Sequence, residues 1–200
     1  MKKYKIGGVI ACLALTLAAC STDEDTETSD SEEEAASPIA DESNESTDEA
    51  ESAVANITGL ADDSEITATA NFTKDEDGKV TLNVSAEGLT EGEHGFHIHE
   101  NPSCEADGDT PGGAAGGHWN PEGMDHGAPN ADPSHLGDTG NLVAAEDGTA
   151  TLEVSIEGWT LGDGADTDVI GHSMIVHANQ DDFEGESGNA GPRVACGIIE

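Results

Sequence analysis

Short segments in which apolar and polar residues alternate recur between residues 53 and 200, and they restrict this part of the chain to an all-β fold. The clearest are Ile66–Phe72 and Val80–Ala86, where every second side chain is apolar. That period is typical of a half-buried antiparallel strand. Asp77-Gly78 stands between the two segments and is a strong hairpin signal. The pair therefore predicts two hydrogen-bonded strands joined by a tight turn.

Further segments complete a set of about eight candidate strands, and no segment shows convincing helical periodicity. A second Asp-Gly pair, at 147–148, joins two of them in the same way as the first. Together these features predict an all-β sandwich or barrel. The additional segments are Val54–Leu60, Gly95–His99, Leu142–Ala145, Thr149–Val154, Ser173–His177 and Val194–Ile199.

Two stretches, 100–140 and 178–192, are long for the loops of a β domain, and long loops in a compact domain are usually functional. His97 and His99 are two residues apart on a candidate strand, so both rings project from the same face. Imidazoles with one carboxylate suit zinc and copper, whereas sites for hard cations show oxygen ligands. The alternative is a random scatter of histidines over an acidic protein. The further candidate ligands are His118, His126, His135, Asp138 and His177.

The first 52 residues have the composition of an export signal and a tether. Residues 1–19 start with three lysines and continue in an apolar run too short to span a membrane, which predicts a secretory signal peptide. Leu17-Ala18-Ala19-Cys20 resembles a bacterial lipoprotein cleavage box, with Cys20 as the lipidated residue; the alternative is an ordinary signal peptide with a chance cysteine. Residues 20–52 are acidic and almost free of apolar side chains, which predicts a disordered spacer. Either signal leads out of the cytoplasm.

The remaining domain, 53–200, is strongly acidic. It holds 29 of the 43 acidic residues against only Lys74, Lys79 and Arg193 as bases, and this charge excludes nucleic acid as a partner. The domain also holds a single pair of cysteines, Cys104 and Cys196. In an exported domain such a pair is most simply a disulfide, although free thiols or metal thiolates are the alternative.

Six sequence blocks in order resemble the copper/zinc superoxide dismutases. The resemblance runs from about Val54 to the C-terminus. It implies an eight-stranded antiparallel Greek-key β-barrel or sandwich with two long functional loops, and superoxide as the substrate. The blocks are Gly95-Phe-His97-Ile-His99, Gly117-His118-Trp-Asn-Pro121, His126-Gly, His135-Leu-Gly-Asp138-Thr-Gly-Asn141, Met174-Ile-Val-His177 and Gly188-Asn-Ala-Gly-Pro-Arg193-Val-Ala-Cys196-Gly.

The resemblance also implies one copper ion and one zinc ion per chain, with the copper cycling between Cu(II) and Cu(I). Copper would be bound by His97, His99, His118 and His177, and zinc by His118, His126, His135 and Asp138. His118 would serve both metals as a bridging imidazolate. Arg193 would attract and orient the anion, the disulfide from Cys104 to Cys196 would help to fix it, and Asp181 would hydrogen-bond one histidine of each metal.

The resemblance leaves other roles open. His94 is expected to fix loops through hydrogen bonds, and His172 to be a structural or surface residue. The 181–192 loop has no lysine and carries Glu184 and Glu186, which predicts a weak or repulsive field for superoxide. A copper-binding or copper-delivery protein without turnover is one alternative function, and a cell-surface adhesion module with incidental zinc is another. Monomer and homodimer stay undecided.

Overall fold

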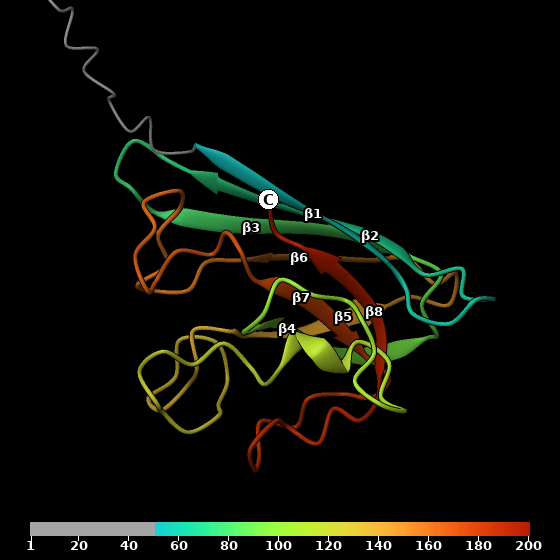
Figure 1. The fold of residues 1–200 in the computed structure, drawn as a ribbon. Helices are drawn as coiled ribbons and strands as arrows, with labels where there is room; N and C mark the ends of the chain where they lie inside the picture. Colours follow the sequence, from blue (N-terminus) through green and yellow to red (C-terminus); the bar gives the residue numbers. More distant parts are fainter. Residues whose placement is uncertain (1–50) are drawn as a thin grey trace, which may run out of the picture. The chain divides into compact units, whose positions relative to one another are not determined.

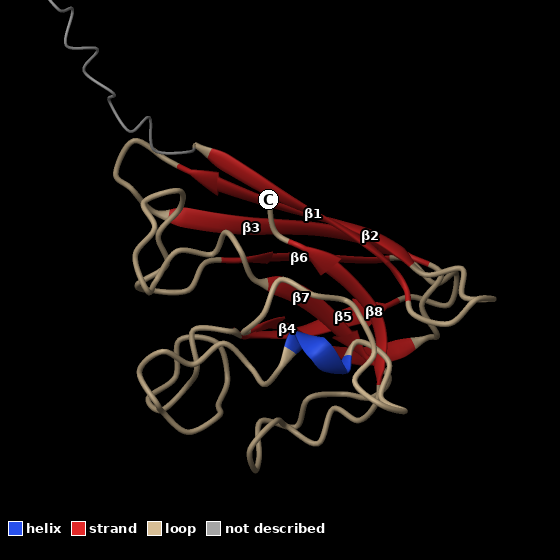
Figure 2. Cartoon of the chain, viewed as in Figure 1, coloured by secondary structure: helices blue, strands red, loops and turns tan. Residues whose placement is uncertain are grey.

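The computed structural model describes residues 51–200, which form a β-barrel of eight strands and one short 3-10 helix (Figures 1 and 2). The predicted signal peptide, Cys20 and nearly all of the predicted 20–52 spacer lie outside the described residues. Within 51–200 no helix has the length and apolarity needed to cross a membrane. The elements are β1 (Ser52–Gly59), β2 (Thr67–Lys74), β3 (Val80–Glu87), β4 (Gly92–His99), η1 (Gly113–Ala115), β5 (Asp138–Ala144), β6 (Ala150–Val154), β7 (Ser173–His177) and β8 (Arg193–Ile198).

All strand pairs are antiparallel, and the strand order is β5-β4-β7-β8-β1-β2-β3-β6. The two end strands, β5 and β6, also approach each other, so the barrel is nearly closed. The links from β3 to β4 and from β6 to β7 join strands that are not neighbours, as in a Greek key. The predicted eight-stranded antiparallel barrel is thus confirmed.

The core follows the alternation in the sequence. In β3, the side chains of Val80, Leu82 and Val84 are buried in the barrel, while the residues between them face outward. Phe72 packs edge-on against Trp159 with ring centroids 5.7 Å apart. The Trp159 Nε1–H in turn donates to the carbonyl of Leu136 at 2.9 Å, which attaches the 100–137 loop to the core.

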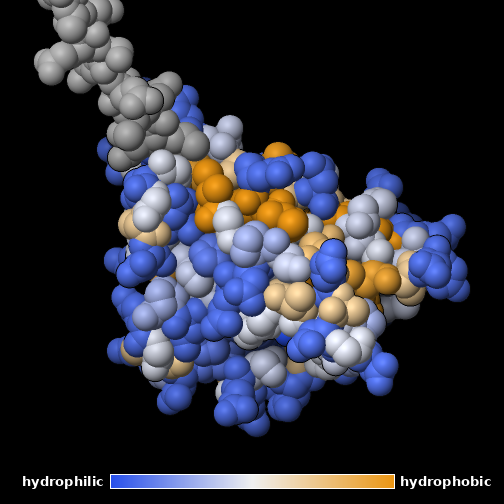
Figure 3. All heavy atoms as spheres, in the orientation of Figure 1, coloured by the Kyte–Doolittle hydropathy of each residue, from blue (hydrophilic) through white to orange (hydrophobic). Residues whose placement is uncertain are grey.

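Strand β4 is buried on both faces near its end, and this places the candidate ligands. Phe96 and Ile98 belong to the barrel core, so the alternating His97 and His99 project from its outer surface. These two imidazoles are nevertheless 0–1% exposed, because the long loops cover them. Figure 1 shows the 178–192 loop and the later part of the 100–137 loop below β4 and β7, and in Figure 3 this side of the domain is largely hydrophilic.

Candidate metal centre

Four buried imidazoles form the first cluster: His97 and His99 on β4, His118 in the loop after η1, and His177 at the end of β7. Each ring offers one nitrogen, and these atoms lie within 4.8 Å of one another. One nitrogen of every ring, Nδ1 in His97 and Nε2 in the other three, is buried without a hydrogen-bond partner. An unsatisfied buried polar group costs about 1–3 kcal/mol. Four such nitrogens in one place therefore fit a common metal ion, and imidazole nitrogen suits copper and zinc.

The second cluster contains His118, His126, His135 and Asp138. The Nδ1 atoms of the three histidines lie 2.9, 3.0 and 3.1 Å from a single oxygen, Oδ1 of Asp138. The other oxygen of Asp138 accepts hydrogen bonds from the backbone N–H groups of Gly127 and His135. Three imidazoles and one carboxylate, converging in a buried place, are a suitable ligand set for a four-coordinate zinc ion.

His118 belongs to both clusters through its two nitrogens. Its Nδ1 faces Asp138, while its Nε2 is the buried, unpartnered atom of the first cluster. Its ring centroid lies 4.1 Å from that of His97 and 5.5 Å from that of His135. The ring therefore lies between the clusters, as a bridging ligand must.

Four of the six rings donate a hydrogen bond from the nitrogen that faces away from the clusters, and these bonds fix the orientation of His97, His99, His126 and His177. Asp181 accepts from one histidine of each cluster: Oδ2 from His97 at 2.8 Å and Oδ1 from His126 at 3.0 Å. His99 donates to the carbonyl of Gly116, and His177 to that of Gly191.

Two residues hold Asp181 in place. Asn141, on β5, bonds both the backbone N–H and the carbonyl of Asp181. Gly188 has a φ of +65°, and a Cβ there would lie 1.6 Å from Oδ1 of Asp181. Only glycine therefore allows the loop to close over this carboxylate. Neither role was predicted, although both residues lie within the quoted sequence blocks.

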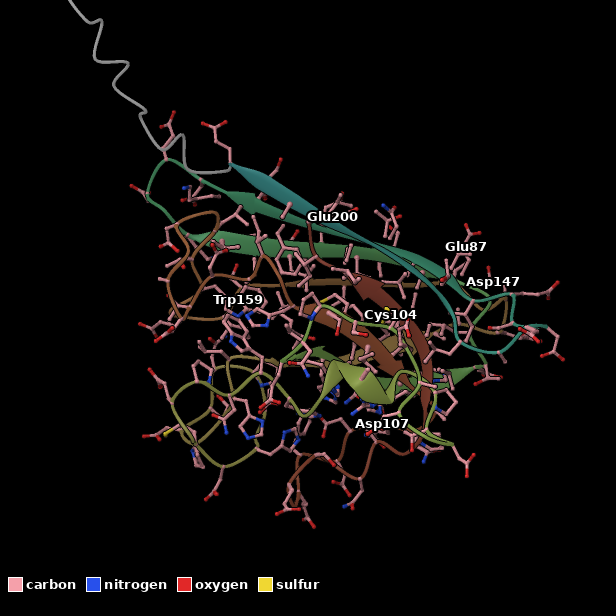
Figure 4. The ribbon with its side chains drawn as sticks, in the orientation of Figure 1. Glu87, Cys104, Asp107, Asp147, Trp159 and Glu200 are labelled. Carbon is pink, nitrogen blue, oxygen red and sulfur yellow. A yellow bond between two sulfur atoms is a disulfide. The ribbon has the colours of Figure 1, made fainter. Side chains whose placement is uncertain are left out.

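Arg193 lies at the start of β8, and the 100–137 loop holds its side chain. Its guanidinium donates to the carbonyls of Gly112 and Gly116 at 2.5 and 2.6 Å. No sequence signal identifies these acceptors, because any residue has a backbone carbonyl. Cys104, in the same loop, forms the predicted disulfide with Cys196 of β8, and Figure 4 shows Cys104 against β7 and β8.

Burial and hydrogen bonding set the protonation of the site. Burial lowers the pKa of His118 to about 4 and that of His177 to about 3, so both are neutral at pH 7, the form that binds metal. Burial opposes charge on His126 too, but the adjacent carboxylates of Asp138 and Asp181 outweigh burial and raise the pKa of His126 to about 9. Burial opposes charge on Asp138 and Asp181 as well, but contacts with His118, His126 and His135 at Asp138, and with His126 and His97 at Asp181, outweigh it. The pKa values of both carboxyl groups therefore lie well below their usual range.

The two remaining histidines stay outside the clusters. His94 contacts the carbonyls of His177 and Thr90 at 2.8 and 2.9 Å, so it ties the end of β7 to the turn before β4 through hydrogen bonds. His172 stacks on Trp119 with centroids 4.5 Å apart and donates to the carbonyl of Glu100. Both roles are structural.

Known proteins share this sequence and fold. The family model described as copper/zinc superoxide dismutase matches residues 66–199. A Cu-Zn superoxide dismutase of Haemophilus parainfluenzae is 46% identical over 129 residues, which cover 60% of this chain and 67% of that protein. An extracellular Cu-Zn superoxide dismutase of Onchocerca volvulus is 42% identical over 139 residues, covering 64% and 66%. This chain thus aligns with about two thirds of each relative's length.

A solved structure supports the same similarity. The crystal structure of the clock protein EA4 superposes with a TM-score of 0.65 and 32% identity, and covers 74% of this chain and 93% of that one. A Cu-Zn superoxide dismutase of Neisseria meningitidis is similar at 45% identity over 129 residues, which cover 60% of this chain and 67% of that protein.

Proposed function

The chain belongs to the copper/zinc superoxide dismutase family of oxidoreductases, and from that membership we propose that its domain disproportionates superoxide to dioxygen and hydrogen peroxide. The observation that carries the proposal is the convergence of four buried, unpartnered imidazole nitrogens beside a second cluster that shares His118. A copper-delivery protein would need the first cluster alone. The shared ring supports a catalytic pair of sites.

We assign copper to the first cluster and zinc to the second, one ion of each per chain. Bound copper would supply one-electron redox chemistry, and bound zinc a fixed charge without redox change. The donor sets support this division, because the first cluster contains only imidazoles and the second adds the Asp138 carboxylate.

The chain's own residues would bind the anion and move protons. Two of the five N–H donors of Arg193 are used by loop carbonyls, which leaves other donors and a fixed positive charge for superoxide. The Nε2 atom of His118 is positioned to accept a proton and to release it toward reduced dioxygen. The reaction consumes two protons for every two superoxide ions, so a protonatable atom facing the first cluster is required.

The proposed location is outside the cytoplasm, with Cys20 carrying a lipid anchor. Residues 1–19 would direct export, and residues 20–52 would hold the domain away from the outer face of the membrane or within the periplasm. The disulfide supports an oxidising compartment. One of the relatives is described as extracellular.

Metal analysis of the purified protein combined with a superoxide assay tests the proposal. We expect about one copper and one zinc per chain and turnover of superoxide. Arg193→Gln should lower kcat/KM by about tenfold to a hundredfold, because it removes a fixed charge at the reacting anion, and should leave both metals bound. Arg193→Lys should recover part of the loss. A protein loaded with copper that shows no turnover would instead be a carrier.

A further inference from the structure

A cleft of about 350 Å³ opens from the surface onto the second cluster. It lies between the 100–137 loop and the 178–192 loop. Its wall includes His118, His126 and His135, three of the four candidate zinc ligands. It does not include His97, His99 or His177, so it reaches the first cluster only through the shared His118.

Carboxylates surround the mouth of this cleft. Glu100, Asp125 and Glu186 line it, all three are exposed, and no lysine or arginine lines it. Asp125 directly precedes His126 in the chain, and Glu186 approaches from the opposite loop. A cleft lined by charges of one sign concentrates ions of the opposite sign. This one therefore attracts cations and repels anions, superoxide included.

The residues at the floor of the cleft are a second, independent indication that a cation binds there. His126 is 7% exposed and its Nδ1 is buried without a hydrogen bond, 3.0 Å from Oδ1 of Asp138. Asp138 is fully buried. The acidic cleft thus ends at His126, and the unpartnered nitrogen of His126 lies beside a buried carboxylate; both groups are suitable ligands for a metal ion.

We propose that this cleft is the entrance through which the second cluster captures a divalent cation. The inference rests on the assignment of the second cluster as a metal site. It adds a role for Glu100, Asp125 and Glu186, which would guide the cation without binding it in the final complex. Arg193, in contrast, is held beside the first cluster by Gly112 and Gly116. The carboxylates of this cleft and the guanidinium of Arg193 therefore favour ions of opposite charge.

A neighbouring cleft provides a matched control. Glu122, Asp132 and Glu157 line it, but it touches only His135 among the ligands of the second cluster. These three carboxylates are exposed as well. Neutralising these three carboxylates changes the net charge as much as neutralising the first three does, in a cleft that still reaches His135.

The test measures how fast the full chain, stripped of metal, takes up cobalt(II), whose visible absorption reports four-coordinate nitrogen and oxygen ligands. The triple variant Glu100→Gln, Asp125→Asn, Glu186→Gln should bind cobalt about tenfold more slowly at low ionic strength. The difference should shrink at high salt, since salt screens exposed charges. The control triple Glu122→Gln, Asp132→Asn, Glu157→Gln should stay within about twofold of the unmodified chain.

Three outcomes separate the possibilities. Equal rates of cobalt uptake in the unmodified chain and both triple variants would contradict the proposed entrance. Equal slowing in both triple variants would also overturn it, because the overall charge would then be sufficient. If the unmodified chain showed no four-coordinate cobalt absorption, the metal assignment of the second cluster would fail, and the entrance with it.

Discussion

Asp181 connects the two clusters through the two oxygens of one carboxylate. Each oxygen accepts a hydrogen bond from a different ligand, His97 or His126, and Asn141 and Gly188 keep the carboxylate in this position. Hydrogen bonds of this kind orient metal ligands and increase their basicity. The role predicted for Asp181 from the family resemblance therefore has a matching geometry, and it stays open to test.

Asp181→Asn should weaken both metals together. An amide presents one oxygen instead of two, so at least one of the two imidazoles loses its acceptor. We expect the affinity for zinc and for copper to fall by about tenfold to a hundredfold, measured by chelator competition. Asp182→Asn is the control, because the carboxylate of Asp182 is exposed and bonds only Asn189 and the Glu184 N–H. Equal effects of the two substitutions would contradict this role.

At the scale of elements, the disulfide joins the 100–137 loop to strand β8. Cys104 lies in the loop that supplies the carbonyls of Gly112 and Gly116, and Cys196 lies three residues after Arg193. The disulfide therefore fixes the 100–137 loop against β8, and the same loop supplies the carbonyls that hold Arg193 of β8. It links residues 92 positions apart.

Replacing both cysteines by serine should lower the free energy of unfolding by about 4–5 kcal/mol, from the loop entropy released in the unfolded chain. Denaturant titration of the loaded protein measures this loss. Reducing the disulfide in the unmodified chain should give a similar value, which separates the bond from the effect of the serines. A loss below about 1 kcal/mol would contradict the expected stabilisation.

The elements also show what the sequence could and could not predict. The sequence predicted all eight strands, two of them from clear alternation, but β4 begins at Gly92 instead of Gly95, and β5 at Asp138 instead of Leu142. The hydrogen-bond ladder continues through polar residues: Glu93 pairs with Val143, and Gly95 with Asn141. Periodicity detects which side chains are buried, so it does not detect strand residues whose side chains are polar or absent.

The candidate ligands were found for a different reason. Imidazole and carboxylate side chains can be recognised in a sequence as possible metal ligands. The structure brings all seven candidate ligands into the two expected clusters. Two of the four acceptors that orient them are backbone carbonyls, those of Gly116 and Gly191. A carbonyl is present at every position, so only the fold reveals which ones face the site.

At the scale of the whole molecule, the acidic surface bears on how the substrate arrives. The domain holds 29 acidic residues against three basic ones, and superoxide carries a negative charge. Arg193 and the bound metals provide the positive potential near the first cluster, while Glu184 and Glu186 stand in the adjacent loop. Attraction is therefore confined to the immediate site, and the approach from a distance is unfavourable.

Added salt should consequently leave kcat/KM for superoxide unchanged or raise it. Exposed charges are screened beyond about 10 Å at 0.1 M ionic strength, so salt removes the long-range repulsion and leaves the short-range attraction of Arg193. The decay of superoxide, followed in the loaded enzyme over a range of ionic strengths, measures the effect. Glu184→Lys should raise kcat/KM at low salt and make it fall as salt is added, because the loop would then carry an attractive charge. A steep fall in the unmodified enzyme would mean that a positive approach field exists despite the acidic surface.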